Sequence, residues 1–457
     1  MKKEINVGII GCGVSGLCAL TQLLDDDMIL DHLREIIIID ARPLEDSNIC
    51  ANASEELYLN TSANINSLLV NSPNHFYEWL DKNKEDFNSQ NFSLLEVKPE
   101  GFYPRKLFFY YMKDVFNTYL EKAKSFGIKI KMINQYVEEI QREDDGRFRL
   151  NLADKNSVLV HHAISAIGDG KCINKYDYLQ GHPNYISKPC VPIENYSDIF
   201  KKKQVLILGT MLSAVDALLL LLKFSPRITL SSGSGTFPAV RSSYMSNVNK
   251  YEELLKFRDI NALLQNFLCM VKTAYGSDED QTNIGYKSKD DSWCHYVAPF
   301  LNRVNDLWED SSEEEKIFYK NVYNAHRTKR FLSAIPNVIA DKILPKIKKS
   351  EISVKSGLQN VVYETSINKY KASYLDGKYI YFDACINATA ATNNSKKDLF
   401  LPQFLNTPNF HILGDSNIRN FMNNGIFLYV REVQKRIIPS IRNELEVPRF
   451  LRTNRGI

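Results

Sequence analysis

The chain has 457 residues, of which 44% are hydrophobic and 24% are charged, a composition typical of soluble globular proteins. This length predicts two or three domains, because a single hydrophobic core rarely extends so far. The 57 basic and 54 acidic residues leave a net charge of only +3. The overall charge balance therefore indicates neither nucleic acid nor an anionic membrane as a partner.

The cysteines and the apolar stretches both favour a cytoplasmic protein. The eight cysteines are scattered, with no C-x-x-C pair, which predicts reduced thiols and no disulfide framework or metal site. The N-terminus is superficially similar to a secretory signal, but Glu4 lies where that signal would be basic. The apolar stretch 214–224 is too short to span a bilayer. We therefore expect a soluble, cytoplasmic protein without a membrane partner.

The first motif is a cluster of four of the chain's 20 glycines within nine positions near the N-terminus. An apolar run at 5–10 has strand character, and apolar residues at 14–24 are spaced for a helix face. Between them, Gly11 permits a tight turn, Gly13 lets a pyrophosphate approach the backbone, and Gly16 lets the helix pack closely on the strand. The phosphates would then lie at the positive end of the helix.

A second apolar strand, 35–40, ends in Asp40, at about the distance expected for a carboxylate that binds the adenosine ribose. The strand, turn, helix and second strand together favour a dinucleotide site over an ordinary glycine turn. The alternative for Asp40 is a solvated carboxylate at a strand end. FAD and NAD share this fingerprint, so the motif does not choose between them.

The rest of the chain suggests a second half of similar plan. Segments 129–170 and 351–390 each alternate in short strands around an Asp-Gly turn and end in an apolar strand with small residues. Between them, 204–224 reads as another strand, turn and helix. The helical stretch 245–345 interrupts this second half, and such an insertion could close over the site as a lid.

The second glycine motif is altered, because Met211 stands where the middle glycine is expected between Gly209 and Ala214. Alanine is an accepted variant at the third position. A methionine side chain, in contrast, would restrict the approach of a pyrophosphate. This half either binds its nucleotide more loosely, binds it differently, or no longer binds one.

Residues 57–112 carry a resemblance to a known family. LYLNTSANINSLLVNSPNHFYEWL at 57–80 resembles its Leu-Asn-Thr-x-Ala stretch and F-x-x-W-L element, and FYPRKLFFYYM at 102–112 resembles its Pro-Arg-x-x-x-x-x-Tyr signature. ISAIG and INATA are similar to its Ala-Thr-Gly turns, and LGDS to its Gly-Asp element. The family is the FAD/NAD(P)-binding, NAD(FAD)-dependent dehydrogenase-like proteins, which are related to flavin-containing and N-hydroxylating monooxygenases.

The resemblance implies an α/β fold with two Rossmann-like dinucleotide-binding domains. The FAD domain would comprise 1–195 and 391–457, and the inserted NAD(P)-type domain would comprise 196–390 with the helical insertion at 245–345. The residues implied to bind FAD are Gly11, Gly13, Gly16, Asp40, Asn60, Thr61, Arg105 and Asp415. The residues implied to bind NAD(P)H are Gly209, Met211, Ser213 and Ala214.

Several of these residues have simpler structural interpretations. Arg105 follows Pro104 and could begin a helix. Asn60 and Thr61 have side chains that commonly stabilise turns, and Asp415 could cap the segment that follows it.

The strand RITLSSGSG at 227–235 lacks the arginine that similar proteins often place at its end for a 2′-phosphate, and the nearest cations that could substitute are Arg227 and Arg241. The choice between NADPH and NADH therefore stays open.

The resemblance implies an FAD-dependent oxidoreductase whose flavin is reduced by NAD(P)H and reoxidised by an organic acceptor or by oxygen. With oxygen, it would be an N- or S-hydroxylating monooxygenase of a small-molecule substrate. The residues show no catalytic triad, and the catalytic residues are not identified. Met211 and Ala390, which replaces a second glycine, motivate one alternative, an FAD-binding sensor with a vestigial NAD(P) site. The other alternative is a flavin oxidase that its substrate reduces directly.

Overall fold

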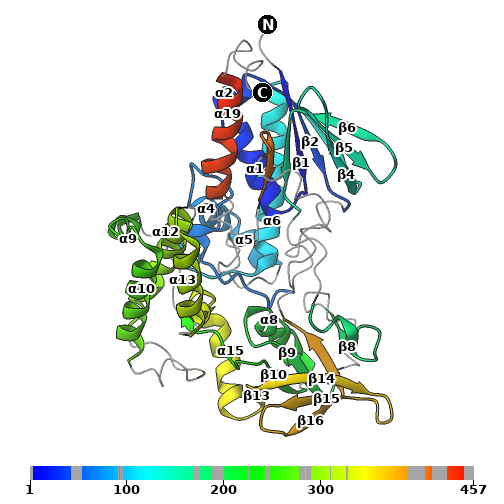
Figure 1. Cartoon of the computed structure of the whole chain (residues 1–457), viewed down its shortest axis with the longest axis vertical. Helices are drawn as coiled ribbons and strands as arrows, with labels where there is room; N and C mark the ends of the chain where they lie inside the picture. Colours follow the sequence, from blue (N-terminus) through cyan, green and yellow to red (C-terminus); the bar gives the residue numbers. More distant parts are fainter. Residues whose placement is uncertain are drawn as a thin grey trace.

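Two parallel sheets and a helical unit make up the described part of the computed structural model (Figure 1). The residues that the structure describes are 4–42, 54–90, 92, 94, 96–167, 174–187, 200–224, 226–241, 248–276, 284, 290–308, 310–325, 328–389, 407–413 and 430–446. Within these ranges each sheet has five strands, and a three-stranded antiparallel meander accompanies each. The predicted α/β fold with two Rossmann-like units and a helical insertion is confirmed.

The first sheet has the strand order β18, β7, β1, β2, β3, with all neighbours parallel. Its strands are β1 (Ile5–Ile10), β2 (Leu33–Ile39), β3 (Lys129–Ile133), β7 (His162–Ser165) and β18 (Phe410–Ile412). The helices of this unit are α1 (Val14–Leu24), α2 (Asp27–Leu30), α6 (Arg105–Ser125), the π-helical turn η6 (Val433–Ile437) and α19 (Ile438–Glu446). β1 and β2 are almost continuously apolar because parallel strands are covered on both faces.

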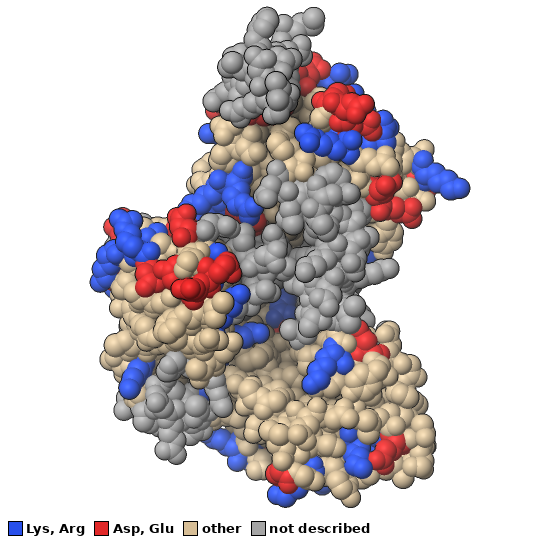
Figure 2. Space-filling view, viewed as in Figure 1, with Lys and Arg blue, Asp and Glu red and all other residues tan. Residues whose placement is uncertain are grey.

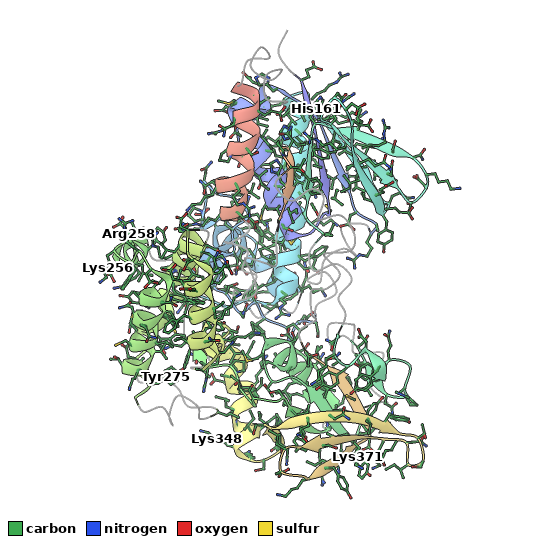
Figure 3. All side chains as sticks on the ribbon, viewed as in Figure 1. His161, Lys256, Arg258, Tyr275, Lys348 and Lys371 are labelled. Atoms are coloured by element: carbon green, nitrogen blue, oxygen red, sulfur yellow. The ribbon has the colours of Figure 1, made fainter. Side chains whose placement is uncertain are left out.

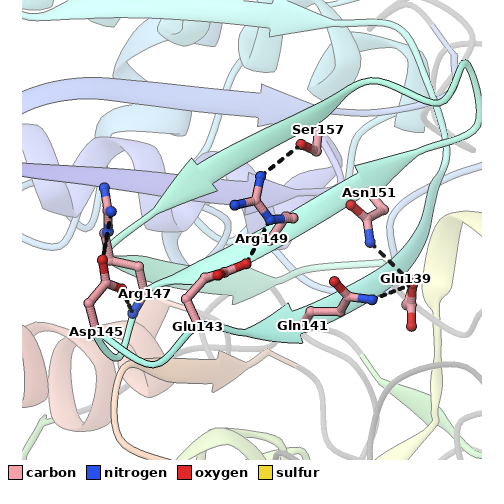
Figure 4. A network of polar contacts seen from close by, with 8 residues as sticks. All are labelled: Glu139, Gln141, Glu143, Asp145, Arg147, Arg149, Asn151 and Ser157. Atoms are coloured by element: carbon pink, nitrogen blue, oxygen red, sulfur yellow. Dashed lines mark hydrogen bonds and ion pairs between the residues drawn. The ribbon is translucent and has the colours of Figure 1, made fainter.

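The first meander covers one face of this sheet. Its strands are β4 (Val137–Arg142), β5 (Phe148–Leu152) and β6 (Ser157–Val160). The inward face buries Phe148 and Leu150, whereas the outward face carries polar pairs such as Arg149 with Glu143 at 2.6 Å (Figure 4). Gly8 is the glycine of the opening cluster that lies outside the loop, on β1. A Cβ added to it would lie 3.1 Å from a Leu150 methyl carbon, so the absence of a side chain at Gly8 makes room for the meander.

The second sheet has the order β13, β10, β9, β17, β8 and is also parallel. Its strands are β8 (Tyr185–Ile186), β9 (Gln204–Leu208), β10 (Arg227–Ser231), β13 (Ile352–Lys355) and β17 (Ala384–Asn387). Around it lie η2 (Asp177–Leu179), α8 (Leu212–Leu221), η4 (Leu222–Phe224) and the meander β14 (Leu358–Glu364), β15 (Lys369–Tyr374) and β16 (Tyr379–Phe382). β8 precedes residue 195 and yet pairs in this sheet. The division of the chain at 195 and 390 stays a prediction.

The helical unit occupies the predicted insertion and has its own hydrophobic core, which includes Phe267, Trp293 and Phe300. Its elements are α9 (Val248–Leu254), α10 (Ile260–Tyr275), η5 (Ser292–Tyr296), α12 (Val297–Trp308), α13 (Glu313–Ala325) and α14 (Lys329–Leu332). β11 (Val240–Arg241), β12 (Ile335–Pro336) and α15 (Asn337–Lys348) connect it to the second sheet unit. The labelled side chains of Figure 3 mark the units, with His161 on the first, Lys371 on the second and Lys256 on the helical unit.

A charged cluster joins the helical unit to the C-terminal helices. Asp306 of α12 accepts hydrogen bonds from Arg431 at 2.8 Å and from Lys435 at 2.7 Å, and Tyr251 of α9 also donates to it. Burial acts to raise the pKa of Asp306, but the hydrogen bonds from Lys435, Tyr251 and Arg431 outweigh it and hold the pKa below its usual value. The insertion is therefore tied to the first unit at a point far along the chain.

Three helical segments complete the layer beside α6: η1 (Ala63–Ile65), α4 (His75–Lys82) and α5 (Lys84–Ser89). The F-x-x-W-L element lies on α4, where Phe76 packs edge-on against Phe108 of α6 with ring centroids 5.2 Å apart. Aromatic burial thus explains this element of the sequence.

Neither a helix that could span a membrane nor a side-chain cluster that could hold a metal ion occurs among the described residues. None of the helices there is long and apolar enough to cross a membrane. The same part of the chain contains no cluster of three or more His, Cys, Asp or Glu side chains that could hold a metal ion. Basic and acidic side chains are interspersed over the face shown in Figure 2, in agreement with the small net charge.

Candidate functional site

The first glycine loop joins β1 to α1, and two of its glycines are required by backbone contacts. Gly11 has φ +105°, and a Cβ there would lie 2.4 Å from the carbonyl oxygen of Ala166 at the end of β7. A Cβ on Gly16 would lie 2.1 Å from the carbonyl oxygen of Gly11. Both positions therefore exclude a side chain for reasons internal to the fold.

Gly13 differs, because a Cβ added there would meet no atom within 4 Å. Gly13 is the N-cap residue of α1, its conformation is extended, and no side chain caps the helix. The first turn of α1 carries no acidic residue. Open space therefore lies before the positive end of an 11-residue helix, and these residues fit the pyrophosphate of a dinucleotide.

Asp40 lies directly after β2, at the same edge of the sheet as the glycine loop. Its carboxylate accepts hydrogen bonds from the backbone N–H of Cys12 at 2.8 Å and of Arg42 at 3.1 Å. The side chain is half-exposed, so part of it stays open to a ligand. The structure thus shows a loop-bracing role for Asp40 and leaves the predicted ribose contact as a proposal.

Asp40→Asn and Asp40→Ala should separate these two roles. Asparagine keeps an oxygen for the Cys12 N–H and loses only the bond to the exposed Arg42 N–H, so we expect thermal stability within about 1 kcal/mol of the wild type. We also expect roughly 10-fold weaker FAD binding, because a neutral amide is a poorer acceptor for ribose hydroxyls. Alanine should lower both stability and affinity. Fluorescence titration with FAD and thermal unfolding measure the two quantities. Equal FAD affinity in wild type and Asp40→Asn would leave only the bracing role.

The second glycine loop, between β9 and α8, has the same backbone shape as the first. Gly209 has φ +105°, and a Cβ there would lie 2.8 Å from the carbonyl oxygen of Ala388 at the end of β17. Met211 takes the place of Gly13 as N-cap, with φ −100°, a value that any residue adopts without strain. Its side chain is half-buried, Ser213 is exposed and Ala214 is fully buried. The loop has kept its shape while a side chain occupies the helix entrance.

Met211→Gly should therefore improve the second site. Removing the side chain opens the entrance of α8, and we expect NADPH or NADH to bind roughly 10-fold more tightly, in line with the gain of one good phosphate contact. Isothermal titration with each nicotinamide measures the change, and FAD content serves as the internal control. An unchanged nicotinamide affinity would show that Met211 does not obstruct the ligand.

The surroundings of the two cations considered for a 2′-phosphate do not favour that role, which stays a prediction. Arg227 begins β10 and lines a hollow of about 480 Å³ at the amino ends of the strands, the edge opposite to Gly209. Arg241 is buried, and its guanidinium donates to the carbonyl oxygen of Ala334 at 2.7 Å.

At the carboxyl edge of the second sheet, the exposed Lys355 ends β13 in register with Ser231 of β10. Nothing in the local sequence pattern marks Lys355, because its place depends on the pairing of β13 with β10.

The segment that carries the family resemblance lies where three hydrophobic cores meet. Leu57 belongs to the core of the second unit, Leu59 and Ala63 to that of the first, and Ile65 to that of the helical unit. A chain segment shared by three cores is held in one conformation from several sides, which suits a site between the units.

Within this segment the predicted flavin residues have unequal surroundings. The Thr61 hydroxyl donates to the Asn66 side-chain oxygen at 2.8 Å, and the Asn66 amide donates back to the Thr61 carbonyl at 3.1 Å. Thr61 is thus used within its own turn, as the simpler interpretation expects. Asn60 is half-exposed. Asp415 and Ala390 lie outside the described residues.

Arg105 is the first residue of α6, and its guanidinium reaches into the second unit. Nη1 and Nη2 donate to the two carboxylate oxygens of Asp216 on α8 at 2.7 and 2.9 Å, and Nε donates to the Tyr58 carbonyl at 3.0 Å. Burial raises the pKa of Asp216, although Arg105 acts in the opposite direction. Sequence reasoning named Arg105 but missed Asp216, for which the sequence offers no signal beyond an acidic residue in an apolar helix.

The fold and the first loop define a dinucleotide-binding architecture, and comparison with known proteins agrees. Residues 8–170 match the family model described as FAD-NAD(P)-binding. This match covers the first glycine loop, β2 and the segment with the Pro-Arg signature. No curated protein sequence gave a match.

Solved structures with the same fold cover nearly the whole chain. The ornithine hydroxylase of Pseudomonas aeruginosa in its reduced form has a TM-score of 0.59 and 14% identity, with 97% of this chain and 98% of that chain covered. The ornithine N-hydroxylase of Kutzneria sp. 744, with reduced FAD, NADP+ and L-ornithine, has a TM-score of 0.58 and 10% identity, with 96% and 100% covered. The cadaverine monooxygenase of Erwinia amylovora, bound to FAD, has a TM-score of 0.54 and 12% identity, with 97% and 94% covered.

Proposed function

We propose that this chain is an FAD-dependent oxidoreductase that takes electrons from NAD(P)H and hydroxylates the nitrogen of a small amine with oxygen. The observation that carries the proposal is the open space at Gly13 before α1, within the segment that matches the FAD-NAD(P)-binding family. The similar ornithine and cadaverine enzymes support the amine as substrate class. When bound, FAD accepts two electrons from the nicotinamide and passes them to oxygen or another acceptor.

The chain's own residues would supply binding and orientation. The N-terminus of α1 and the backbone at Gly13 would hold the FAD pyrophosphate, and Asp40 would hold the adenosine ribose while it braces the loop. The loop from Gly209 to Ala214 would hold NAD(P)H at the carboxyl edge of the second sheet. The segment shared by the three cores would then lie between the two nucleotides.

Anaerobic reduction of the purified protein tests the proposal. We expect yellow protein whose absorbance at the flavin maximum bleaches with NADPH or NADH, followed by oxygen consumption coupled to hydroxylation of an added amine such as ornithine or cadaverine. Peroxide released per electron pair separates hydroxylation from leakage. Protein that stays colourless with added FAD would refute the proposal.

Met211 favours a second candidate, an FAD-binding protein whose second nucleotide site no longer works. That protein would be yellow but would not bleach with either nicotinamide. The Met211→Gly variant would then bind the nicotinamide more tightly than the wild type, but the bound nicotinamide would not reduce the flavin.

A further inference from the structure

A largely buried ion pair forms part of the contact between the two dinucleotide units. The Arg105 and Asp216 side chains are only 18% and 9% exposed, and they meet through two parallel hydrogen bonds. Such a fork fixes both distance and direction, and removing one partner leaves a buried charge without compensation. Arg105 belongs to the first unit and Asp216 to the helix that follows the second glycine loop.

A second ion pair of opposite polarity lies just after the same helix. Lys223 of η4, the 3-10 turn that follows α8, pairs with Glu56 of the first unit at 2.8 Å, and the two side chains are 39% and 32% exposed. Burial acts to raise the pKa of Glu56, but hydrogen bonds from Lys223 and Ser54 outweigh it and lower that pKa. The second unit thus contributes the acid Asp216 to one pair and the base Lys223 to the other. If the units docked in a shifted position that exchanged the partners, Asp216 would face Glu56, and like charges would meet.

Apolar and aromatic contacts of the intervening residues strengthen the same docking. Leu57 is buried in the core of the second unit, and the ammonium of Lys342 on α15 lies 5.0 Å from the ring centre of Tyr58. The Tyr58 carbonyl also accepts the Arg105 Nε hydrogen bond. Residues 56–58 therefore connect both charged pairs in one short stretch.

We propose that Arg105 and Asp216 are positioning residues that hold α8, and with it the second glycine loop, at one orientation to the first unit. The inference rests on the proposed function, in which a hydride, one proton with two electrons, leaves the reduced nicotinamide and reaches the flavin. That transfer requires the reacting atoms at roughly 3 to 3.5 Å. The two hydrogen bonds between Arg105 and Asp216 fix α8, the helix that follows the second glycine loop. They are therefore placed to set the distance between the nicotinamide and the flavin.

The test uses FAD-loaded full-length protein in a double-mutant cycle of Arg105→Gln, Asp216→Asn and the double variant. Lys122→Gln is the control, because the Lys122–Asp25 ion pair, whose side chains are 34% and 18% exposed, also has a partly buried carboxylate but lies wholly within the first unit. Hydrogen exchange of the peptides that cover 54–59 and 212–221 reports the docking without any reaction. Stopped-flow anaerobic reduction reports the limiting rate and the nicotinamide affinity separately.

We expect both single variants to retain FAD, to exchange roughly 10-fold faster in these two peptides, and to be reduced at least ~10-fold more slowly at saturating nicotinamide. Nicotinamide affinity should change less than about 3-fold, and the double variant should be no worse than either single one. Lys122→Gln should match the wild type in all readouts. This pattern would not follow from a general loss of stability, which would also weaken FAD and nicotinamide binding.

Two results would overturn the inference. Unchanged exchange in Asp216→Asn would show that the pair does not hold the units together. Loss of FAD in Arg105→Gln with normal behaviour of Asp216→Asn would show that Arg105 acts on the flavin directly. If the wild type binds FAD but is not reduced, the proposed function fails, and the exchange data still decide whether the pair fixes the docking.

Discussion

Gly13→Val should produce a folded protein that has lost at least ~100-fold in FAD affinity, about 2.7 kcal/mol of binding free energy. Among the described residues no atom lies within 4 Å of a Cβ added at Gly13, so a valine side chain has room beside them. The same space lies in front of the α1 N-terminus, where the pyrophosphate is proposed to bind. The valine side chain would therefore clash with the bound pyrophosphate and not with the protein around it.

Fluorescence titration with FAD and thermal unfolding of the apoprotein measure this effect. Gly233→Val is the matched control, because a Cβ at Gly233 also meets no atom within 4 Å, but this glycine follows β10 in the second unit. The control should bind FAD like the wild type, and both variants should unfold within about 1 kcal/mol of it. Normal FAD content in Gly13→Val would place the cofactor elsewhere.

Gly16→Ala should destabilise the first unit by about 3 kcal/mol or more, at the upper end of the range for overpacking. The added Cβ would lie 2.1 Å from the Gly11 carbonyl oxygen and 3.1 Å from its carbonyl carbon. Both neighbours are backbone atoms of the turn that joins β1 to α1, so no flexible side chain can move aside. Either α1 must shift away from β1, or the turn must open.

Denaturant unfolding followed by circular dichroism measures this loss as an earlier first transition. Gly13→Ala, in the same loop and with the same change of residue, serves as the control and should stay within about 1 kcal/mol of the wild type. Equal stability of Gly16→Ala and the wild type would mean that the loop is more open than its contacts indicate.

Local spacing in the sequence was enough to predict both glycine loops. The conformation of residues 11–16 depends on a turn and on the helix that follows within a few residues, so the three glycines report it directly. The alternation in the two meanders likewise reports which face is buried, as Phe148 and Leu150 show. The second loop, too, has the shape that its altered glycine pattern predicts, with Met211 as its N-cap.

The local structure could therefore be predicted from the sequence: two strand–turn–helix loops, their meanders and the helical character of the insertion. Tertiary packing, in contrast, brings Arg105 to Asp216, 111 residues away, and joins residues 57–65 to three cores. It also places Arg227 at the amino edge of the second sheet and buries the Arg241 guanidinium against the Ala334 carbonyl. The physical reason is that these contacts depend on how separately formed units pack against one another. No spacing within a short stretch of chain encodes that packing.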